Sequence, residues 1–320
     1  MNRRKFLRDA AGAASGAALL GIGGEGAAQA LTSGAAGDPP IIRLDPKIGE
    51  WSMAGESVFD NRRWGNRWQG ITASESHYFM TNNQYGGPDP SNPQDEGIWR
   101  LDHTFSNSYM MAVSQYPGEH LGDLTYDHNG NRLFVPMESN SRIWKLYVGP
   151  DGSVVHGGYG KLGGSGTQPQ GSSFAWCAYD PRENLLYSSI YGDNGPVGEI
   201  HAYDPARNFE WVRTVKLPYQ LREINGGHIT KNGNLYLTTD WSKEIVSYRI
   251  PLRGKGDTAG YWGRYRIDAP DLEVEGIVVG SPTNYDSGHV QVHVGCVDVD
   301  PLDTDDVYIK HFSVPFPTLL

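Results

Sequence analysis

The stretch His120–Val148 reads HLGDLTYDHNGNRLFVPMESNSRIWKLYV and decides the fold. It contains three short strand patterns, Leu121–Tyr126, Arg132–Pro136 and Ile143–Val148. The first two are separated by a turn signal that ends in the dipeptide Asn-Gly, which favours a tight hairpin. In the third pattern alternate residues share one face, as they do in a β-strand. The stretch is therefore predicted to form three antiparallel strands of one sheet.

The same outline recurs along the chain, over WQGITASESHYFMTNN with GIWRLDH, over AWCAYDPRENLLYSSIYG with EIHAYDP, and over NGGHITKNGNLYLTTDW with EIVSYRI. The equivalent positions on the first strand of each unit are Ile71, Leu124, Ala178, Ile229 and Ile277. The intervals between them are 53, 54, 51 and 48 residues. A period of about fifty residues with several strands in each unit is typical of β-propeller blades. We therefore predict an all-β, five-bladed propeller.

The fifth unit contains EVEGIVV, HVQVHVG and DVYIKHFSV but no outer strand after them. The segment Trp51–Phe59 has strand character and precedes the first full unit, so it is predicted to be that outer strand and to close the ring. A single propeller domain is then expected over residues 41–320. The alternative is a six-bladed propeller with one blade assembled from residues 41–66.

The first thirty residues resemble a twin-arginine export signal. Asn2–Leu7 contains the paired arginines, an apolar run covers Ala10–Ile22, and Ala28-Gln29-Ala30 fits small-residue cleavage. Residues 31–40 are small and polar and are predicted to be a flexible leader. The resemblance implies a periplasmic or extracellular destination. The apolar run is too short for a membrane-spanning helix, which needs about 18 residues.

The formal net charge is −10, and the first thirty residues are themselves net basic, so the rest of the chain is more acidic still. Phosphate binding needs clustered Lys and Arg, so nucleic acid and anionic membranes are unfavourable partners. We expect the two cysteines, Cys177 and Cys296, to be buried thiols rather than a disulfide. A small molecule or a glycan is therefore the expected partner.

In a propeller the inner strands surround a central channel, and the loops at one end form a funnel that usually holds ligands. The pairs next to the equivalent positions are Gln69-Gly70, Gly122-Asp123, Trp176-Cys177, Gly227-His228 and Glu275-Gly276. The glycines are expected where strands crowd the axis. Beside them, Asp123, His228 and Glu275 are the candidate catalytic residues, and Gln69 is a candidate ligand-binding residue.

Further polar candidates lie on neighbouring strand ends and loops, namely Glu138, Glu223, Asn225, Asp240, His120 and Asn83. Oxygen donors around an axis could hold Ca²⁺, with Asp123 and Glu275 as first candidates. Two of the carboxylates could instead act as general acid and base on a glycan or an ester. A third alternative is that these side chains bond to backbone groups and orient loops, and their spacing does not decide between these uses.

Aromatic residues near strand ends could stack on a sugar ring or pack between blades. Those beside the funnel candidates are Trp68, Trp176 and Trp241. They are counted as candidate ligand-binding residues, with packing as the alternative.

Residues 273–277 read Glu-Val-Glu-Gly-Ile, which is similar to the D-x-E-G-I stretch of an inner strand in phytase-like esterase propellers. The blade pattern over residues 67–314 also resembles that of gluconolactonase and strictosidine-synthase relatives. The resemblance implies an axial Ca²⁺ on acidic and Asn ligands, here Glu275 and Asp123. His228 and Cys177 depart from that pattern.

The sequence thus predicts an exported, monomeric propeller that binds a small molecule or glycan in an acidic, aromatic-lined funnel. One alternative is a hydrolase or lyase acting on a glycan, lactone or ester through funnel carboxylates. Another is a protein-interaction platform.

Overall fold

The computed structural model describes residues 52–59, 67–83, 97–102, 105, 108–113, 120–138, 141–166, 169–171, 173–280, 289–298 and 306–315. All of them belong to the second of two units into which the chain divides, residues 40–320. The predicted export signal and leader lie outside the described residues. Among the helices of the described part, none is long and apolar enough to cross a membrane.

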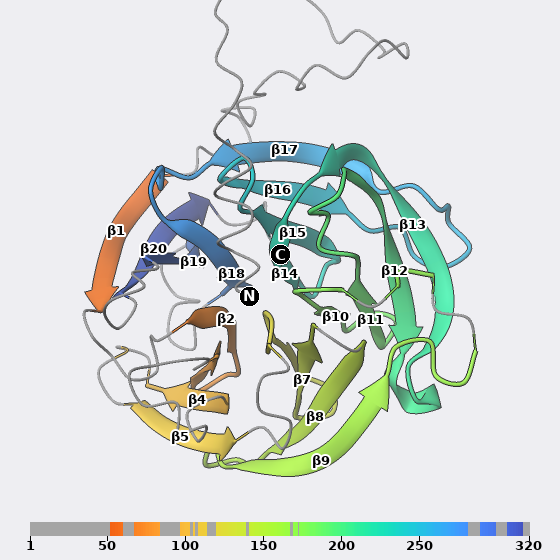
Figure 1. Ribbon diagram of the computed structural model, residues 1–320, viewed down its shortest axis with the longest axis horizontal. Coiled ribbons are helices and arrows are strands. Elements are labelled where there is room, and N and C mark those ends of the chain that lie inside the picture. The colour runs from red at the N-terminus through yellow and green to blue at the C-terminus, as the bar shows by residue number, and fades with distance from the viewer. Residues whose placement is uncertain are drawn as a thin grey trace, which may run out of the picture. The chain divides into compact units, whose positions relative to one another are not determined.

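The described strands form five antiparallel sheets of four strands each. In Figure 1 these sheets surround a common centre as blades, with the first strand of each blade innermost. The four strands of blade 1, from the inside outwards, are β2 (Trp68–Ala73), β3 (Tyr78–Asn82), β4 (Gly97–Leu101) and β5 (Ser108–Val113). Those of blade 2 are β6 (Thr125–Asp127), β7 (Arg132–Met137), β8 (Arg142–Val148) and β9 (Val154–Lys161).

The next two blades repeat this order. Blade 3 consists of β10 (Ala178–Asp180), β11 (Leu185–Ser188), β12 (Val197–Asp204) and β13 (Glu210–Leu221), with a 3-10 turn, η2 (Pro205–Arg207), before the last strand. Blade 4 consists of β14 (Ile224–Ile229), β15 (Asn234–Thr239), β16 (Glu244–Arg249) and β17 (Gly260–Arg266). The predicted five-bladed, all-β architecture is confirmed, and the six-bladed alternative is wrong.

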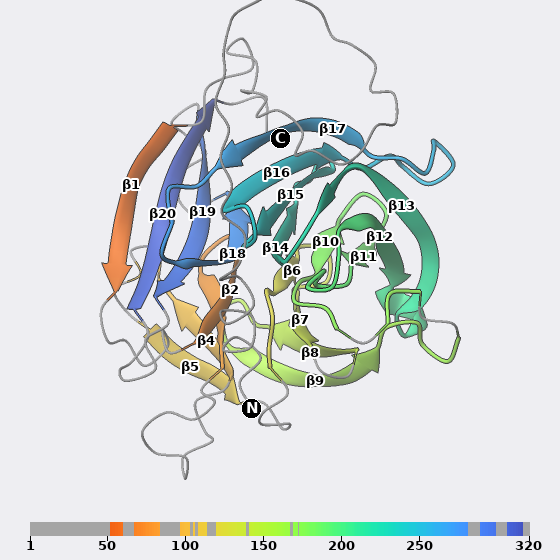
Figure 2. The same cartoon turned by 45° about the horizontal axis from the view of Figure 1, so that its top comes forward.

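Blade 5 closes the ring with a strand from the other end of the propeller. Its strands, again from the inside, are β18 (Glu273–Val279), β19 (His289–Asp298), β20 (Asp306–Pro315) and β1 (Ser52–Phe59). β1 pairs antiparallel with β20 from Ser52 opposite Ser313 to Phe59 opposite Val307, with a register shift between Met53 and Gly55. Figure 2 shows β1 beside β20 at the rim. The predicted closure is thus confirmed, and β1 pairs with the outer side of β20 as the outermost strand of blade 5.

The first turn of the organising stretch has four residues, since Asp127 pairs with Arg132 across it. The Asp127 carboxylate accepts hydrogen bonds from the backbone N–H groups of Asn129 and Gly130, each at 2.9 Å. An Asp side chain that bonds two residues ahead mimics a backbone turn. Arg132 also donates to the same carboxylate. The turn is therefore held by Asp127 rather than by the Asn-Gly dipeptide alone.

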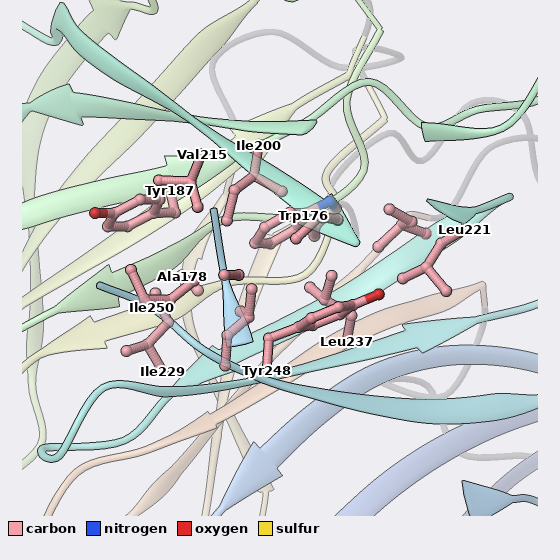
Figure 3. Close-up of a cluster of buried hydrophobic side chains, with 14 of the residues drawn as sticks. Trp176, Ala178, Tyr187, Ile200, Val215, Leu221, Ile229, Leu237, Tyr248 and Ile250 are labelled. Atoms are coloured by element: carbon pink, nitrogen blue, oxygen red, sulfur yellow. The ribbon is translucent and has the colours of Figure 1, made fainter. Parts of the chain in front are cut away.

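The core consists of apolar clusters between adjacent blades. Figure 3 shows the cluster between blades 3 and 4, in which Trp176 lies among Ile200, Leu237 and Tyr248. Trp176 is fully buried, and a Cβ added to Gly227 would lie 2.3 Å from its ring. The ring therefore needs a glycine on the facing strand. Both cysteines are buried free thiols, as expected.

Candidate functional site

The five inner strands begin at one edge of their sheets, which we call the entry face, and end at the opposite edge, the exit face. In four blades a residue one to three positions after the second strand donates its backbone N–H to the carbonyl of a residue one to five positions before the inner strand. These pairs, with N–O distances of 3.0, 2.9, 3.2 and 2.9 Å, are Asn83–Arg67, Glu138–His120, Tyr191–Ser173 and Asp240–Glu223. The repeated bond places one pair of side chains from each of these blades at the entry face.

Three of the residues before the inner strands have a left-handed backbone. The φ angles are 51° for Arg67, 53° for His120 and 49° for Glu223. Residues other than glycine rarely adopt this region, and such conformations cost about 1–3 kcal/mol each and cluster at binding and active sites. Equivalent positions in three blades thus have a polar side chain although glycine would adopt the same backbone conformation without strain.

Tyr191, from blade 3, is surrounded by acidic groups of three other blades. Burial raises the pKa of its phenol far above the ordinary value. The negative charges of four carboxylates raise this pKa further, and these carboxylates are Glu223, Asp240, Glu275 and Glu138. The shared backbone bonds place Glu138, Glu223 and Asp240 at the same edge of the sheets as Tyr191. Four sequence-predicted residues are therefore gathered at the entry face, with Tyr191 as their common neighbour.

The acidic groups within this cluster differ in their partners. Asp240 accepts hydrogen bonds from the Lys243 ammonium at 2.5 Å and from the Val274 N–H at 2.6 Å, so it links blade 4 to blade 5. Burial raises the pKa of Glu223, and the charge of Asp240 adds to that rise, while Lys243 opposes it. Glu275 is 2% exposed. The cluster thus holds more negative than positive charge at a half-buried site.

A histidine with a defined tautomer lies beside the cluster. Gln69 donates its amide N–H to the Trp68 carbonyl at 2.8 Å, which leaves its Oε1 as the atom facing His120. That oxygen can only accept, so His120 Nε2, 2.7 Å away, carries a proton. A Glu138 oxygen lies 3.7 Å from the same Nε2. Blades 1 and 2 therefore present an oriented imidazole next to a carboxylate.

Asp123 has a different environment, on the axis and fully buried. Its carboxylate accepts backbone N–H groups from three other blades, Ile71 at 2.9 Å, Gly227 at 2.9 Å and Ile277 at 3.4 Å. The N–H of Leu124 is a fourth donor. Burial raises the pKa of Asp123 well above its ordinary value, and the four donors oppose that rise. Both oxygens are therefore committed to holding blades together.

Glycines make room for this carboxylate. A Cβ added to Gly70 or Gly276 would lie 2.5 Å from Asp123 Oδ1, and one added to Gly122 would lie 2.0 Å from a backbone oxygen of blade 3. The predicted crowding of the inner strands at the axis is found in these contacts. The axis at this level is filled by the Asp123 side chain and the flanking backbones, so the entry-face cluster lies above a closed floor.

His228 belongs to the other end of the channel. It lies near the end of β14, and burial lowers the pKa of its imidazole to about 3, with His128 as the second cause. His128 follows β6 at the exit face and contacts Glu75, the Nδ1–Oε1 distance being 3.0 Å. The structure therefore does not bring His228 together with Glu275, and the predicted set of Asp123, His228 and Glu275 does not share one pocket.

The remaining candidates are divided between packing and exposure. Trp68 and Trp176 are fully buried between blades, and a Cβ on Gly295 would lie 1.9 Å from the Trp68 ring. Asn225 donates to the Val274 carbonyl at 2.7 Å and ties blade 4 to blade 5. Trp241 is 60% exposed, and the Arg222 guanidinium lies 5.1 Å from its ring centroid. Of the three tryptophans, Trp241 is the one that can meet a ligand.

Calcium ligation fits this donor set only in part. The entry face supplies carboxylate oxygens, which Ca²⁺ prefers. However, Asp123 has no oxygen to spare, and Asp240 is paired with Lys243. Within the described ranges, no three His, Cys, Asp or Glu side chains are arranged as metal ligands. An axial ion on Asp123 and Glu275 is therefore not a fit for this arrangement.

The sequence matches no family model and no curated protein. Similar solved structures include a protein assigned as a gluconolactonase, with 12% identity, a TM-score of 0.45, and coverage of 85% of this chain and 95% of that chain. Virginiamycin B lyase from Staphylococcus aureus has 12% identity, a TM-score of 0.43, and coverage of 83% and 100%. A luciferin-regenerating enzyme has 10% identity, a TM-score of 0.45, and coverage of 80% of both chains. These values assign no activity to this chain.

Proposed function

We propose that the entry face binds a small polyhydroxylated molecule of the carbohydrate class. The observation that carries this proposal is the set of equivalent backbone bonds that puts Glu138, Glu223 and Asp240 at one edge with Tyr191, and the charges of these carboxylates and of Glu275 raise the pKa of its phenol. Carboxylates accept hydrogen bonds from hydroxyl groups, and a ligand with several hydroxyls can meet several of them at once. An anionic ligand would be repelled by the same groups.

An aromatic face supports the same ligand class. Trp241 follows Asp240 directly and is 60% exposed, which allows a sugar ring to stack on it. Arg222, which precedes Glu223, lies against the indole and holds it in place. The acceptors and the flat ring are therefore contributed by neighbouring residues of blade 4.

A second candidate function is hydrolysis or elimination on a glycan, lactone or ester. His120 favours it, because Gln69 holds a proton on Nε2, so that in the neutral ring Nδ1 is the nitrogen that would act as general base. The raised pKa of Glu223 suits a carboxyl group that gives a proton to a leaving oxygen. In this case Glu275 and Glu138 would bind the substrate, and Asp123 and His228 would take no part.

Binding is tested with a panel of glucose, N-acetylglucosamine, cellobiose and glucono-δ-lactone, followed by titration calorimetry and by product analysis. We expect at least one compound to bind, and Glu275→Gln and Tyr191→Phe to weaken it about tenfold or more, since a lost hydrogen bond to a charged group is worth about 1.5–3 kcal/mol. Glu199→Gln, an exposed carboxylate on β12, is the matched control. Equal affinities in all four proteins would refute the site, and turnover of a panel member would favour the enzyme.

Three further expectations complete the proposal. Export by the twin-arginine route follows from the first thirty residues and is tested by fractionating cells that express the protein with both arginines changed to lysine. A monomer is expected in solution and is checked by light scattering. A role as a protein-interaction platform would be favoured if no small molecule bound and the entry-face variants instead lost a protein partner.

A further inference from the structure

Four polar side chains form a continuous hydrogen-bonded row across the closing blade and its neighbour. The Tyr78 hydroxyl lies 3.0 Å from His293 Nε2, and His293 Nδ1 lies 2.6 Å from His311 Nδ1. His311 Nε2 lies 2.8 Å from the Ser57 hydroxyl. The four residues come from β3, β19, β20 and β1, one from each strand. The row therefore runs from blade 1 through blade 5 to the strand that closes the ring.

The surroundings of the row are apolar. The Phe105 ring stacks on Tyr78 at 4.5 Å between centroids and lies 6.1 Å from each imidazole centroid. Ile309 and Val307 on β20 belong to the same buried cluster as Tyr78, and His293 is 3% exposed. The row is buried at Tyr78 and His293 and only partly buried at His311 and Ser57, so a bond lost at the His293 end is not replaced by water.

The row is uncharged only while both imidazoles are neutral. A bond between two Nδ1 atoms needs one ring to donate and the other to accept, and the outer nitrogens can then bond to Tyr78 and Ser57 in either direction. A first added proton places a positive charge among apolar side chains. A second one leaves two N–H groups and two positive charges facing each other, so the bond between His293 and His311 is lost.

The neighbouring charges do not cancel this effect. Burial lowers the pKa of His293 to about 3, and the charge of His311 adds to the shift. Burial also lowers the pKa of His311, while Glu56 on β1 works against it. Glu56 is itself paired with Lys310 on β20. Tyr78 is the titratable group that β3 turns toward the pair, and β19 contributes His293 itself.

We propose that the row Tyr78–His293–His311–Ser57 is an acid-sensitive latch that holds the ring-closing strand β1 in place at neutral pH and releases it on acidification. The sign follows from proton uptake. A histidine of β19 or β20 that release of β1 exposes to water titrates near pH 6.5, whereas the same ring in the closed blade stays neutral to lower pH. Closure is thus fully stable above about pH 6.5 and weakens as the pH falls toward the lowered values.

Hydrogen exchange at the amides of β1 tests the latch, with protection factors compared at pH 7.5 and pH 5.0. We expect β1 protection to fall by about tenfold per pH unit for each proton taken up below pH 6.5, while β11 and β15 keep theirs. Unchanged β1 protection would overturn the proposal. An equal loss in all blades would also overturn it, because this describes global acid unfolding.

Two further measurements do not depend on a drastic variant. Ser57→Ala removes the bond between His311 and β1 but keeps both histidines, and it should lower the protection of the β1 amides already at pH 7.5. The control is His128→Gln, on the exit face, which should leave the pH dependence of β1 protection as in the wild type. The NMR signals of His293 and His311 should not titrate as long as β1 stays protected. A titration of either ring near pH 6.5 with β1 still protected would refute the latch.

Discussion

Asp123→Asn should destabilise the propeller strongly although it changes a single atom. The two carboxylate oxygens accept N–H groups of Ile71 on one side and of Gly227 and Ile277 on the other. An amide replaces one oxygen with an NH₂ group, which then points at a backbone donor in either orientation. At least one buried N–H is therefore left without an acceptor.

The size of the effect follows from these bonds. The less costly orientation gives up the Ile71 bond, and an unsatisfied buried N–H costs about 1–3 kcal/mol. The remaining bonds lose the charge of their acceptor, which reduces bonds worth about 1.5–3 kcal/mol to neutral ones of about 1 kcal/mol. The sum is about 2–7 kcal/mol, or a Tm lowered by roughly 4–28 °C at about 2–4 °C per kcal/mol. Asp123→Ala, which frees every donor, should cost more than Asp123→Asn.

Urea unfolding followed by circular dichroism measures this difference directly. Glu199→Gln, an exposed carboxylate, is the control and should unfold as the wild type does. An Asp123→Asn protein whose free energy of unfolding lies within about 1 kcal/mol of the wild-type value would refute the account of Asp123 as an axial pin, since that is the net value of one ordinary hydrogen bond.

Three other changes have defined outcomes. Trp176→Ala should lower the free energy of unfolding by about 3–5 kcal/mol in urea melts, because the ring fills the interface between blades 3 and 4. Gly227→Ala should also destabilise the protein, since the added Cβ would lie 2.3 Å from the same ring. Asp240→Asn should lower the pKa of Glu223 toward its ordinary value, because it removes a neighbouring negative charge and leaves Lys243 unpaired; an unshifted Glu223 carboxyl signal in an NMR titration would contradict this. Chelator should leave the Tm unchanged if no Ca²⁺ binds at the entry face, whereas a fall that added Ca²⁺ reverses would show that an ion stabilises the native state.

The repeat was readable from sequence because its signals are local. Strand alternation, turn residues and the fifty-residue period all lie within short stretches, and the missing outer strand of the fifth unit left Trp51–Phe59 with one place to pair. The glycines of the inner strands also predict that the strands lie close together at the axis. The structure agrees, because a Cβ on Gly70 or Gly276 would clash with Asp123. All of these features are set by residues that are close together in the sequence.

The site was harder to predict because it depends on register between blades. The shared backbone bond aligns Arg67, His120, Ser173 and Glu223, which are 53, 53 and 50 residues apart. In this alignment Gly227, and not Ile229, is equivalent to Ile71 and Leu124. The apolar match had placed blade 4 two residues off, because Asn225-Gly226-Gly227 has no apolar side chain to align. That shift is why His228 was grouped with residues of the entry face.

The corrected register also explains what could have been found. Asp123 is equivalent to Gly70 and Gly226, so one carboxylate stands where two other blades have no side chain. That contrast is visible in sequence once the blades are aligned correctly. Tyr191 can be recognised in the sequence as an aromatic residue near a strand end, whereas Arg67 carries no motif that would assign it to the site. What the residues of the site share is their place beside the backbone hydrogen bond that recurs in each blade, and this bond cannot be read from the sequence.

Asp123 and the entry-face carboxylates are therefore expected to have different roles, one in stability and the other in ligand binding, and the two roles can be measured separately. Asp123 receives backbone donors from three other blades, so its loss acts on the free energy of unfolding. Glu275 and Glu223 lie with Tyr191 above that level, so their loss acts on ligand affinity. A folded Asp123→Asn protein should keep the wild-type Kd below its own Tm. If it lost the ligand while its fold persisted, Asp123 would belong to the binding set and the closed floor of the site would be wrong.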